Sequence, residues 1–343
     1  MAGLSFAADP LGSEQWLAEL EGGLASSRLP AWRASWQEVP DLAACSTTAG
    51  RLLVLSSGPA GPQLSLPADA LAMPGRLDPL VRLARFAAQL TPWGRHGRRL
   101  AIQVHDEQPS ENGALRLDAP AGAARPAEGV IPDPYCLGSR GYLLFRQAYA
   151  AAPPPPWRQR RPLAIWRGAT TGTHAITPRR LEANLRYRLC RHSLRWPGRL
   201  DARFTAVVQC RDPQAQQAVR AELGSQGLLA DSLEPLQMAQ CRWIVDLDGN
   251  VNSWGLLWKL LSGSCVLRVA SARGQWYHHR LVPFRHLVPV RADLADLEQQ
   301  LEWCWANPAA CEAIASAGQE LALQVLADLG VDLLTALRWS LEA

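Results

Sequence analysis

The chain has 343 residues, more than a single hydrophobic core usually holds, so two domains are expected. Its 48% hydrophobic and 19% charged residues exclude an intrinsically disordered protein. A net charge of +4 suits anionic ligands or a membrane surface, and the lack of basic runs interleaved with aromatics argues against nucleic-acid binding.

Cysteine usage and hydropathy indicate the compartment. The eight cysteines lie far apart and form no CxxC pair, which argues against a zinc site and against a disulfide scaffold. The N-terminal residues lack the basic and apolar regions of a secretory signal. No apolar stretch reaches the roughly 20 residues of a membrane span. We therefore expect a cytoplasmic protein, with at most peripheral contact to a membrane.

The N-terminal half shows fewer clear elements than the C-terminal half. Apolar periodicity predicts helices over residues 11–24 and 77–90, and short buried strands over residues 52–56 and 100–104. A segment rich in Ala, Gly and Pro predicts a loop over residues 119–134. Four consecutive prolines, Pro153 to Pro156, form a stiff extended spacer. We therefore expect one domain over residues 1–152 and a second over residues 153–343.

The C-terminal half alternates between strands and helices. Strands are predicted over residues 163–166, 206–209, 243–247, 265–269 and 286–290. Helices are predicted from Pro178, from Pro213, from Ser253 and over residues 294–305 with Asp293 as N-cap, followed by two more helices. Regular alternation of this kind predicts a parallel sheet of Rossmann type.

Polar residues follow the first strand of that half. Arg167 offers a bidentate fork for phosphate, and Gly168 allows the backbone to approach a ligand closely. Thr170 and Thr171 add hydroxyl donors before Gly172. The spacing is neither that of a Walker A loop nor GxGxxG, and an ordinary strand-to-helix turn uses the same residue types. A phosphate loop and a plain turn therefore both remain open.

Residues 241–270, CRWIVDLDGNVNSWGLLWKLLSGSCVLRVA, read as strand, polar turn, helix, turn and strand. Such a unit places ligand-binding loops at strand carboxyl ends. Asp246 and Asp248 could hold Mg²⁺ beside a diphosphate, but Asp248-Gly249-Asn250 is also ordinary turn chemistry. Lys259 is the only lysine, and its compact ammonium differs from the planar fork of arginine. It is a candidate anion ligand, although a single lysine has to fall somewhere.

Asp106 ends the predicted strand over residues 100–104, within the sequence His105-Asp106-Glu107. A carboxylate at the end of a strand can act as a general base toward a substrate hydroxyl. A solvated loop is the alternative, and the local sequence by itself favours it.

Three stretches, residues 165–172, 243–269 and 276–319, together resemble glycosyltransferase family 90. The shared features are a strand ending in WRG-(A/S)-T-T-G, a DxDGNxxSW block with K-L-L-x-GS, and P-(F/Y)-x-H-(L/Y)-V-P-V followed by IAxxGQ. That family includes fungal CAP10 proteins, animal protein O-glucosyltransferases and bacterial LpsA-type lipopolysaccharide glycosyltransferases. In the N-terminal half, only residues 101–106 are similar, to the short strand that carries the family's catalytic aspartate.

The resemblance implies a GT-B-like α/β fold, in which two Rossmann-like domains with parallel sheets face a cleft. It implies an acceptor-side domain, a nucleotide-sugar-binding domain, inverting transfer, and neither a cofactor nor a metal. Asp106 would be the general base. The donor, which we expect to be UDP-linked, would contact Arg167, Gly168, Thr170, Thr171, Asp248, Gly249, Asn250, Ser253, Trp254 and Lys259.

One position departs from the animal enzymes, which carry a phosphate-binding Arg where this chain has Gly255. The glycine form is similar to the bacterial lipopolysaccharide subgroup, and Lys259 becomes the candidate substitute for the missing charge. We therefore expect a transferase that acts on lipopolysaccharide or another cell-envelope glycan, at the inner face of the membrane. A non-catalytic protein that binds a nucleotide sugar or a glycan is the alternative.

Overall fold

The computed structural model describes residues 41–58, 61–90, 97–106, 111–121 and 128–342, so the helix predicted over residues 11–24 lies outside the described residues. The chain divides into two compact units. Unit 1 comprises Met1–Leu144, Arg273–His279 and Gln324–Ala343, and unit 2 comprises Phe145–Ala272 and Arg280–Leu323. The sequence instead suggested a single boundary between residues 152 and 153.

Unit 1 contains a four-stranded sheet in the order β1-β3-β2-β4. Its strands are β1 (Ser46–Thr48), β2 (Leu52–Gly58), β3 (Gly61–Pro67) and β4 (Arg99–Gln103). β2 pairs antiparallel with both β3 and β4, and only β1 and β3 are parallel. Two residues separate β2 from β3, and so short a connection can join only antiparallel strands. The prediction of a parallel, Rossmann-like sheet in this domain is therefore wrong for the described residues.

Helix α3 (Pro74–Leu90) contacts β2 and confirms the helix predicted over residues 77–90. The strands predicted over residues 52–56 and 100–104 are confirmed as β2 and β4. A two-stranded antiparallel sheet joins β5 (Ala119–Pro120), inside the predicted loop, to β10 (Arg273–Gly274). Residues distant in sequence thus meet within unit 1.

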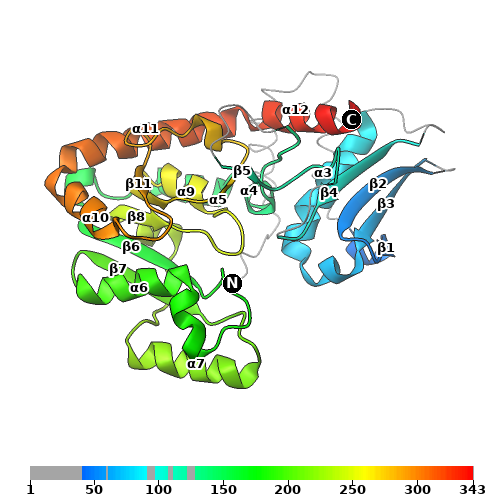
Figure 1. The fold of residues 1–343 in the computed structure, drawn as a ribbon. Helices are drawn as coiled ribbons and strands as arrows, with labels where there is room; N and C mark the ends of the chain where they lie inside the picture. The colour runs from blue at the N-terminus through cyan, green and yellow to red at the C-terminus, as the bar shows by residue number, and fades with distance from the viewer. Residues whose placement is uncertain (1–40, 59–60, 91–96, 107–110, 122–127, 343) are drawn as a thin grey trace. The chain divides into compact units, whose positions relative to one another are not determined.

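Unit 2 is built on a five-stranded parallel sheet (Figure 1). Its strands are β6 (Arg161–Ala169), β7 (Leu200–Ala206), β8 (Cys241–Asp246), β9 (Cys265–Val269) and β11 (Val288–Val290). The predicted parallel sheet is confirmed here. Their order, β11-β9-β8-β6-β7, means that the chain moves from β6 to β7 on one side and then continues from β8 on the other. This reversal is a topological switch point, where open α/β sheets bind their ligands beyond the strand carboxyl ends.

Helices cover both faces of this sheet. The larger core joins α6 (Leu185–Arg195), α10 (Leu297–Ala306) and α11 (Pro308–Ala327) to one face. A smaller cluster includes Leu163, Ile165 and Ile244 and packs against Trp258 of α9 (Leu256–Leu261). The sheet is therefore doubly wound. The described part of the chain holds no helix with the length and apolar character needed to cross a bilayer.

Several predicted elements of unit 2 shift by a few residues. The strand predicted over residues 206–209 is β7, which lies earlier because its alternating Leu200, Ala202 and Phe204 are the residues buried in the core. The helix predicted from Pro178 begins as the 3-10 helix η5 (Pro178–Ala183), after which Asn184 caps α6. Asp296, rather than the predicted Asp293, occupies the N-cap position of α10.

The remaining described elements are helices and 3-10 helices of both units. They are η2 (Leu42–Ala44), η3 (Ala68–Ala72), α4 (Pro134–Gly138), α5 (Leu143–Ala151), η4 (Trp157–Gln159), α7 (Pro213–Ser225), α8 (Pro235–Met238), η6 (His278–Arg280) and α12 (Leu329–Glu342).

Candidate functional site

The loops after β6 and β8 meet at the switch point of the unit 2 sheet. The Gly172 N–H donates to Asn250 Oδ1 at 3.0 Å. Gly172 has a φ of +97°, and a Cβ there would lie 3.1 Å from Gly249 O. Both the backbone conformation and the close approach therefore require glycine. The structure thus brings together two of the predicted donor segments, residues 170–172 and 248–250.

Thr170 fixes the first loop to the segment that follows β7. Its buried hydroxyl donates to Val208 O at 2.7 Å and lies 2.8 Å from Val208 N, whose N–H donates to it. Gly168 lies against Trp166, because a Cβ at Gly168 would be 2.6 Å from the indole ring. These two predicted residues therefore shape the loop, whereas Thr171 borders it beside Gly249.

Arg167 forms an ion pair with Asp201, a carboxylate of the same unit. Its Nη2 donates to Asp201 Oδ2 at 2.7 Å, and its Nη1 donates to the carbonyls of Trp166 and Asp201 at 2.9 Å each. The Arg167 side chain is 11% exposed. A donor diphosphate would have to compete with Asp201 for this guanidinium.

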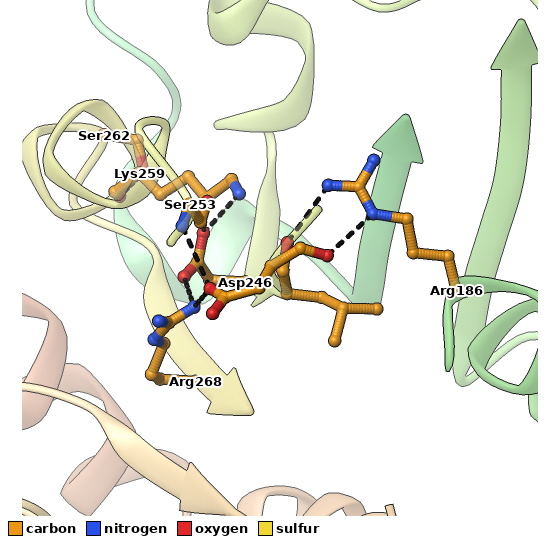
Figure 2. Close-up of polar contacts among 8 residues, drawn as sticks. Arg186, Asp246, Ser253, Lys259, Ser262 and Arg268 are labelled. Carbon is orange, nitrogen blue, oxygen red and sulfur yellow. Dashed lines mark hydrogen bonds and ion pairs between the residues drawn. The ribbon is translucent and has the colours of Figure 1, made fainter. Parts of the chain in front are cut away.

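Asp246 is the centre of a buried charge cluster at the end of β8 (Figure 2). Lys259 Nζ donates to its Oδ1 at 2.5 Å, and Arg268 Nη1 donates to its Oδ2 at 2.6 Å. The Ser253 hydroxyl donates to Oδ1 at 2.6 Å. Burial alone would raise the pKa of Asp246, but Lys259 and Arg268 outweigh burial and lower that pKa to about 2. The carboxylate is therefore ionised at any physiological pH.

Asp248 extends this cluster into the loop. Its Oδ1 accepts from the Ser253 N–H at 2.9 Å and lies 2.8 Å from Arg268 Nη1. Arg268 thus bridges both carboxylates that the sequence offered as metal ligands. Carboxylates paired with cationic side chains are poor ligands for a second cation. The described residues contain no group of three or more metal-ligating side chains.

Lys259 neutralises Asp246 rather than presenting a free charge to the loop. Its side chain is 10% exposed, and its Nζ lies 5.7 Å from the centroid of the Trp258 ring. A Cβ at Gly255 would lie 2.9 Å from Trp258 Nε1 and 3.5 Å from Lys259 Nζ, so a larger residue there would require the Trp258 side chain to shift. Trp254 is partly buried in the turn between Ser253 and Gly255.

Arg186, like Arg268, is a residue of the site that the sequence did not single out. Its Nε donates to Asp248 O at 2.8 Å, its Nη1 to Ala169 O at 3.0 Å and its Nη2 to Leu247 O at 3.4 Å. Figure 2 shows it reaching the chain after β8 from the side away from Lys259. Its guanidinium carbon lies 5.6 Å from the centroid of the Trp166 ring, and burial lowers the pKa of Arg186 to about 10.

Asn184 places Arg186 at this point. Its Oδ1 accepts from the Tyr187 N–H at 3.0 Å, which caps α6. Its Nδ2 donates to Thr170 O at 3.1 Å and to Thr171 O at 3.2 Å. The cap therefore ties the start of α6 to the first loop. The sequence did offer one signal that could have identified Arg186: it lies two residues after an Asn cap, and basic side chains are disfavoured at the start of a helix.

Asp106 lies in unit 1, after β4, with its side chain 24% exposed. Arg76 Nη1 is 3.1 Å from Asp106 Oδ1, and Arg76 also donates to Val104 O at 3.0 Å. The neighbouring His105 lies 3.1 Å from Asp69 Oδ1 through its Nε2. Asp106 is therefore an oriented, partly exposed carboxylate rather than part of a freely solvated loop.

A cavity of about 590 Å³ lies elsewhere in unit 2, at the amino ends of β6 and β7. Arg161, Ser193, Asp201 and Arg203 supply its polar lining. Ligands of open α/β sheets bind beyond the carboxyl ends of the strands, so we place the candidate site at the loops after β6 and β8.

Residues 143–332 match the model of the family described as glycosyl transferase family 90. Uncharacterized protein 027R of Frog virus 3 is 34% identical over 185 residues, which are 50% of this chain and 19% of the viral protein. Bovine protein O-glucosyltransferase 1 is 24% identical over 193 residues, covering 56% of this chain and 44% of the relative. The chain therefore spans less than half the length of these curated relatives.

Among solved structures, the Anabaena protein HepE in complex with UDP-glucose is similar at a TM-score of 0.35 and 12% identity. That similarity covers 58% of this chain and 50% of HepE.

Proposed function

Because the chain belongs to glycosyl transferase family 90, we propose that it transfers a sugar from a nucleotide-sugar donor to a hydroxyl group of a glycan. The observation that carries this proposal is the meeting of the loops after β6 and β8 at the switch point, where Gly172 bonds Asn250. Glycines at this meeting point let main-chain groups approach a ligand closely, as a diphosphate requires.

The proposed donor is a UDP-linked sugar, as we expect from the resemblance to family 90. Its nucleotide and diphosphate would lie along the loops at residues 168–172 and 248–254. Thr171, Gly249 and Asn250 border the place where these loops meet. Asp246 and Asp248 are bound to cationic side chains, which supports transfer without a bridging metal.

The proposed reaction is an inverting displacement at the anomeric carbon of the donor. Asp106 takes the proton of the acceptor hydroxyl while the acceptor oxygen bonds to that carbon. The bond from the carbon to the diphosphate oxygen breaks, and the nucleoside diphosphate leaves with the electron pair. The contact with Arg76 supports this role, since it orients the carboxylate. The GT-B-like architecture implied by the resemblance is part of the same proposal.

The proposed acceptor is lipopolysaccharide core or another cell-envelope glycan, used at the inner face of a membrane with peripheral contact. The support is Gly255, the residue that resembles the bacterial lipopolysaccharide subgroup. The packing of this glycine against Trp258 and Lys259 leaves no room for the arginine of the animal enzymes without rearrangement.

A screen of nucleotide sugars tests the proposal. The full chain is incubated with isotopically labelled UDP-, GDP- and dTDP-sugars, and nucleotide release is followed with and without a lipopolysaccharide extract. We expect one donor to be hydrolysed slowly alone and faster with acceptor. Binding of a donor without any turnover would favour the alternative, a non-catalytic binding protein. If the chain neither bound nor turned over any of these donors, the proposed donor site would be refuted.

A further inference from the structure

Arg186 is a cation in a position where local electrostatics oppose one. It is the second residue of α6, and the amino end of a helix carries partial positive charge. Its bonds go to three main-chain carbonyls, and it forms no ion pair with any described residue. A partly buried cation with this set of partners is stabilised less than one paired with a carboxylate.

The carboxylates closest to it are already neutralised. Asp246 pairs with Lys259 and Arg268, and Asp248 pairs with Arg268. When Arg186 is included, this group therefore contains two carboxylates and three cationic side chains. One positive charge remains uncompensated among these described residues, at the carboxyl edge of β6 and β8.

The guanidinium also borders the two loops. It binds Ala169 O at the end of β6 and Asp248 O after β8, the strands that flank the switch point. A Cβ at Gly249 would lie 2.9 Å from Arg186 Nη2 and 2.8 Å from Thr171 Oγ1. Arg186 thus holds both loops and lies directly beside the glycine at which they meet.

We propose that Arg186 is the positioning residue of the donor site, which fixes the loops after β6 and β8 and supplies the positive charge for a nucleoside diphosphate. This inference rests on the proposed function and assigns to Arg186 the part that the sequence offered to Lys259. Lys259 is paired with the carboxylate of Asp246, whereas Arg186 has no carboxylate partner among the described residues.

The test compares Arg186→Gln and Arg186→Lys with Arg195→Gln, which changes an exposed arginine at the other end of the same helix. Dissociation constants for UDP and for uridine are measured by calorimetry and ligand-observed NMR, with GDP and guanosine in parallel. We expect Arg186→Gln to weaken diphosphate binding about tenfold or more and nucleoside binding less than twofold. Arg186→Lys, which keeps the charge, should weaken diphosphate binding about threefold, and Arg195→Gln should match wild type.

Equal loss of UDP and uridine binding by Arg186→Gln, or unchanged UDP binding, would overturn the inference. If circular dichroism shows that Arg186→Gln is unfolded, Arg186→Lys decides: a selective loss of diphosphate binding supports the inference, and an equal loss or no loss overturns it. A wild-type chain that binds none of UDP, GDP and dTDP would refute the proposed function itself, which separates the two failures.

Discussion

Asp246 shows at the scale of one residue how a motif can mislead. The pair Asp246 and Asp248 invited a metal, but the two carboxylates are held by Lys259 and Arg268 instead. The only lysine of the chain is thus a counterion inside the fold, where its compact ammonium reaches a fully buried carboxylate. Sequence spacing singled out Asp246, Asp248 and Lys259 but neither Arg268 nor the pairing, because Arg268 lies on the next strand, β9.

Replacing Asp246 with Asn should destabilise the protein by about 3–5 kcal/mol, because two buried cations lose their compensating charge. Unfolding in urea at pH 7, followed by circular dichroism, measures the difference. Asp293→Asn is the matched control, since Asp293 pairs with Arg291 at the surface and its loss should change little. A variant at Asp246 as stable as wild type would contradict the charge cluster.

The difference in stability between wild type and Asp246→Asn should depend on pH. The pKa of Asp246 is lowered to about 2, below its unfolded value of about 3.9. Its stabilising effect is therefore complete above about pH 4 and is lost as the pH falls toward about 2. The stability gap between wild type and Asp246→Asn should narrow across this window.

At the scale of elements, the contact between the loops after β6 and β8 defines the candidate site. Periodicity predicted β6, β8, α9 and β9, because buried parallel strands and their helices leave a strong apolar pattern. It could not predict that β6 and β8 are neighbours, since strand order depends on long-range pairing. Arg186 escaped notice for the same reason, as its partners are carbonyls that lie up to 62 residues away in sequence.

Gly172→Ala should impair donor binding as well as stability. Its Cβ would press on Gly249 O at 3.1 Å, and its φ of +97° is strained for alanine. Gly198→Ala is a matched control, because Gly198 has a φ of +80° with no atom within 4 Å of the added Cβ. Both variants should lose about 1–2 kcal/mol of stability, while only Gly172→Ala should weaken UDP binding, by severalfold in calorimetry. Equal UDP affinity in both variants would argue against a site between these loops.

At the scale of the whole molecule, the proposed base and the donor loops belong to different compact units. The sequence predicted the parallel sheet of unit 2 but not the mixed sheet of unit 1, where short, partly exposed strands leave weaker patterns. The proposal that Asp106 is the base rests on the resemblance alone, and the Arg76 contact distinguishes this residue from one in a solvated loop.

The measurement that tests the central claim most directly is a comparison of Asp106→Asn with wild type for both sugar transfer and nucleotide binding. Asp78→Asn serves as the control, because it removes another Asp–Arg pair that involves helix α3. The account predicts that Asp106→Asn binds the nucleotide with wild-type affinity and transfers sugar at least about a hundredfold more slowly. Transfer at a near wild-type rate by this variant would contradict the account.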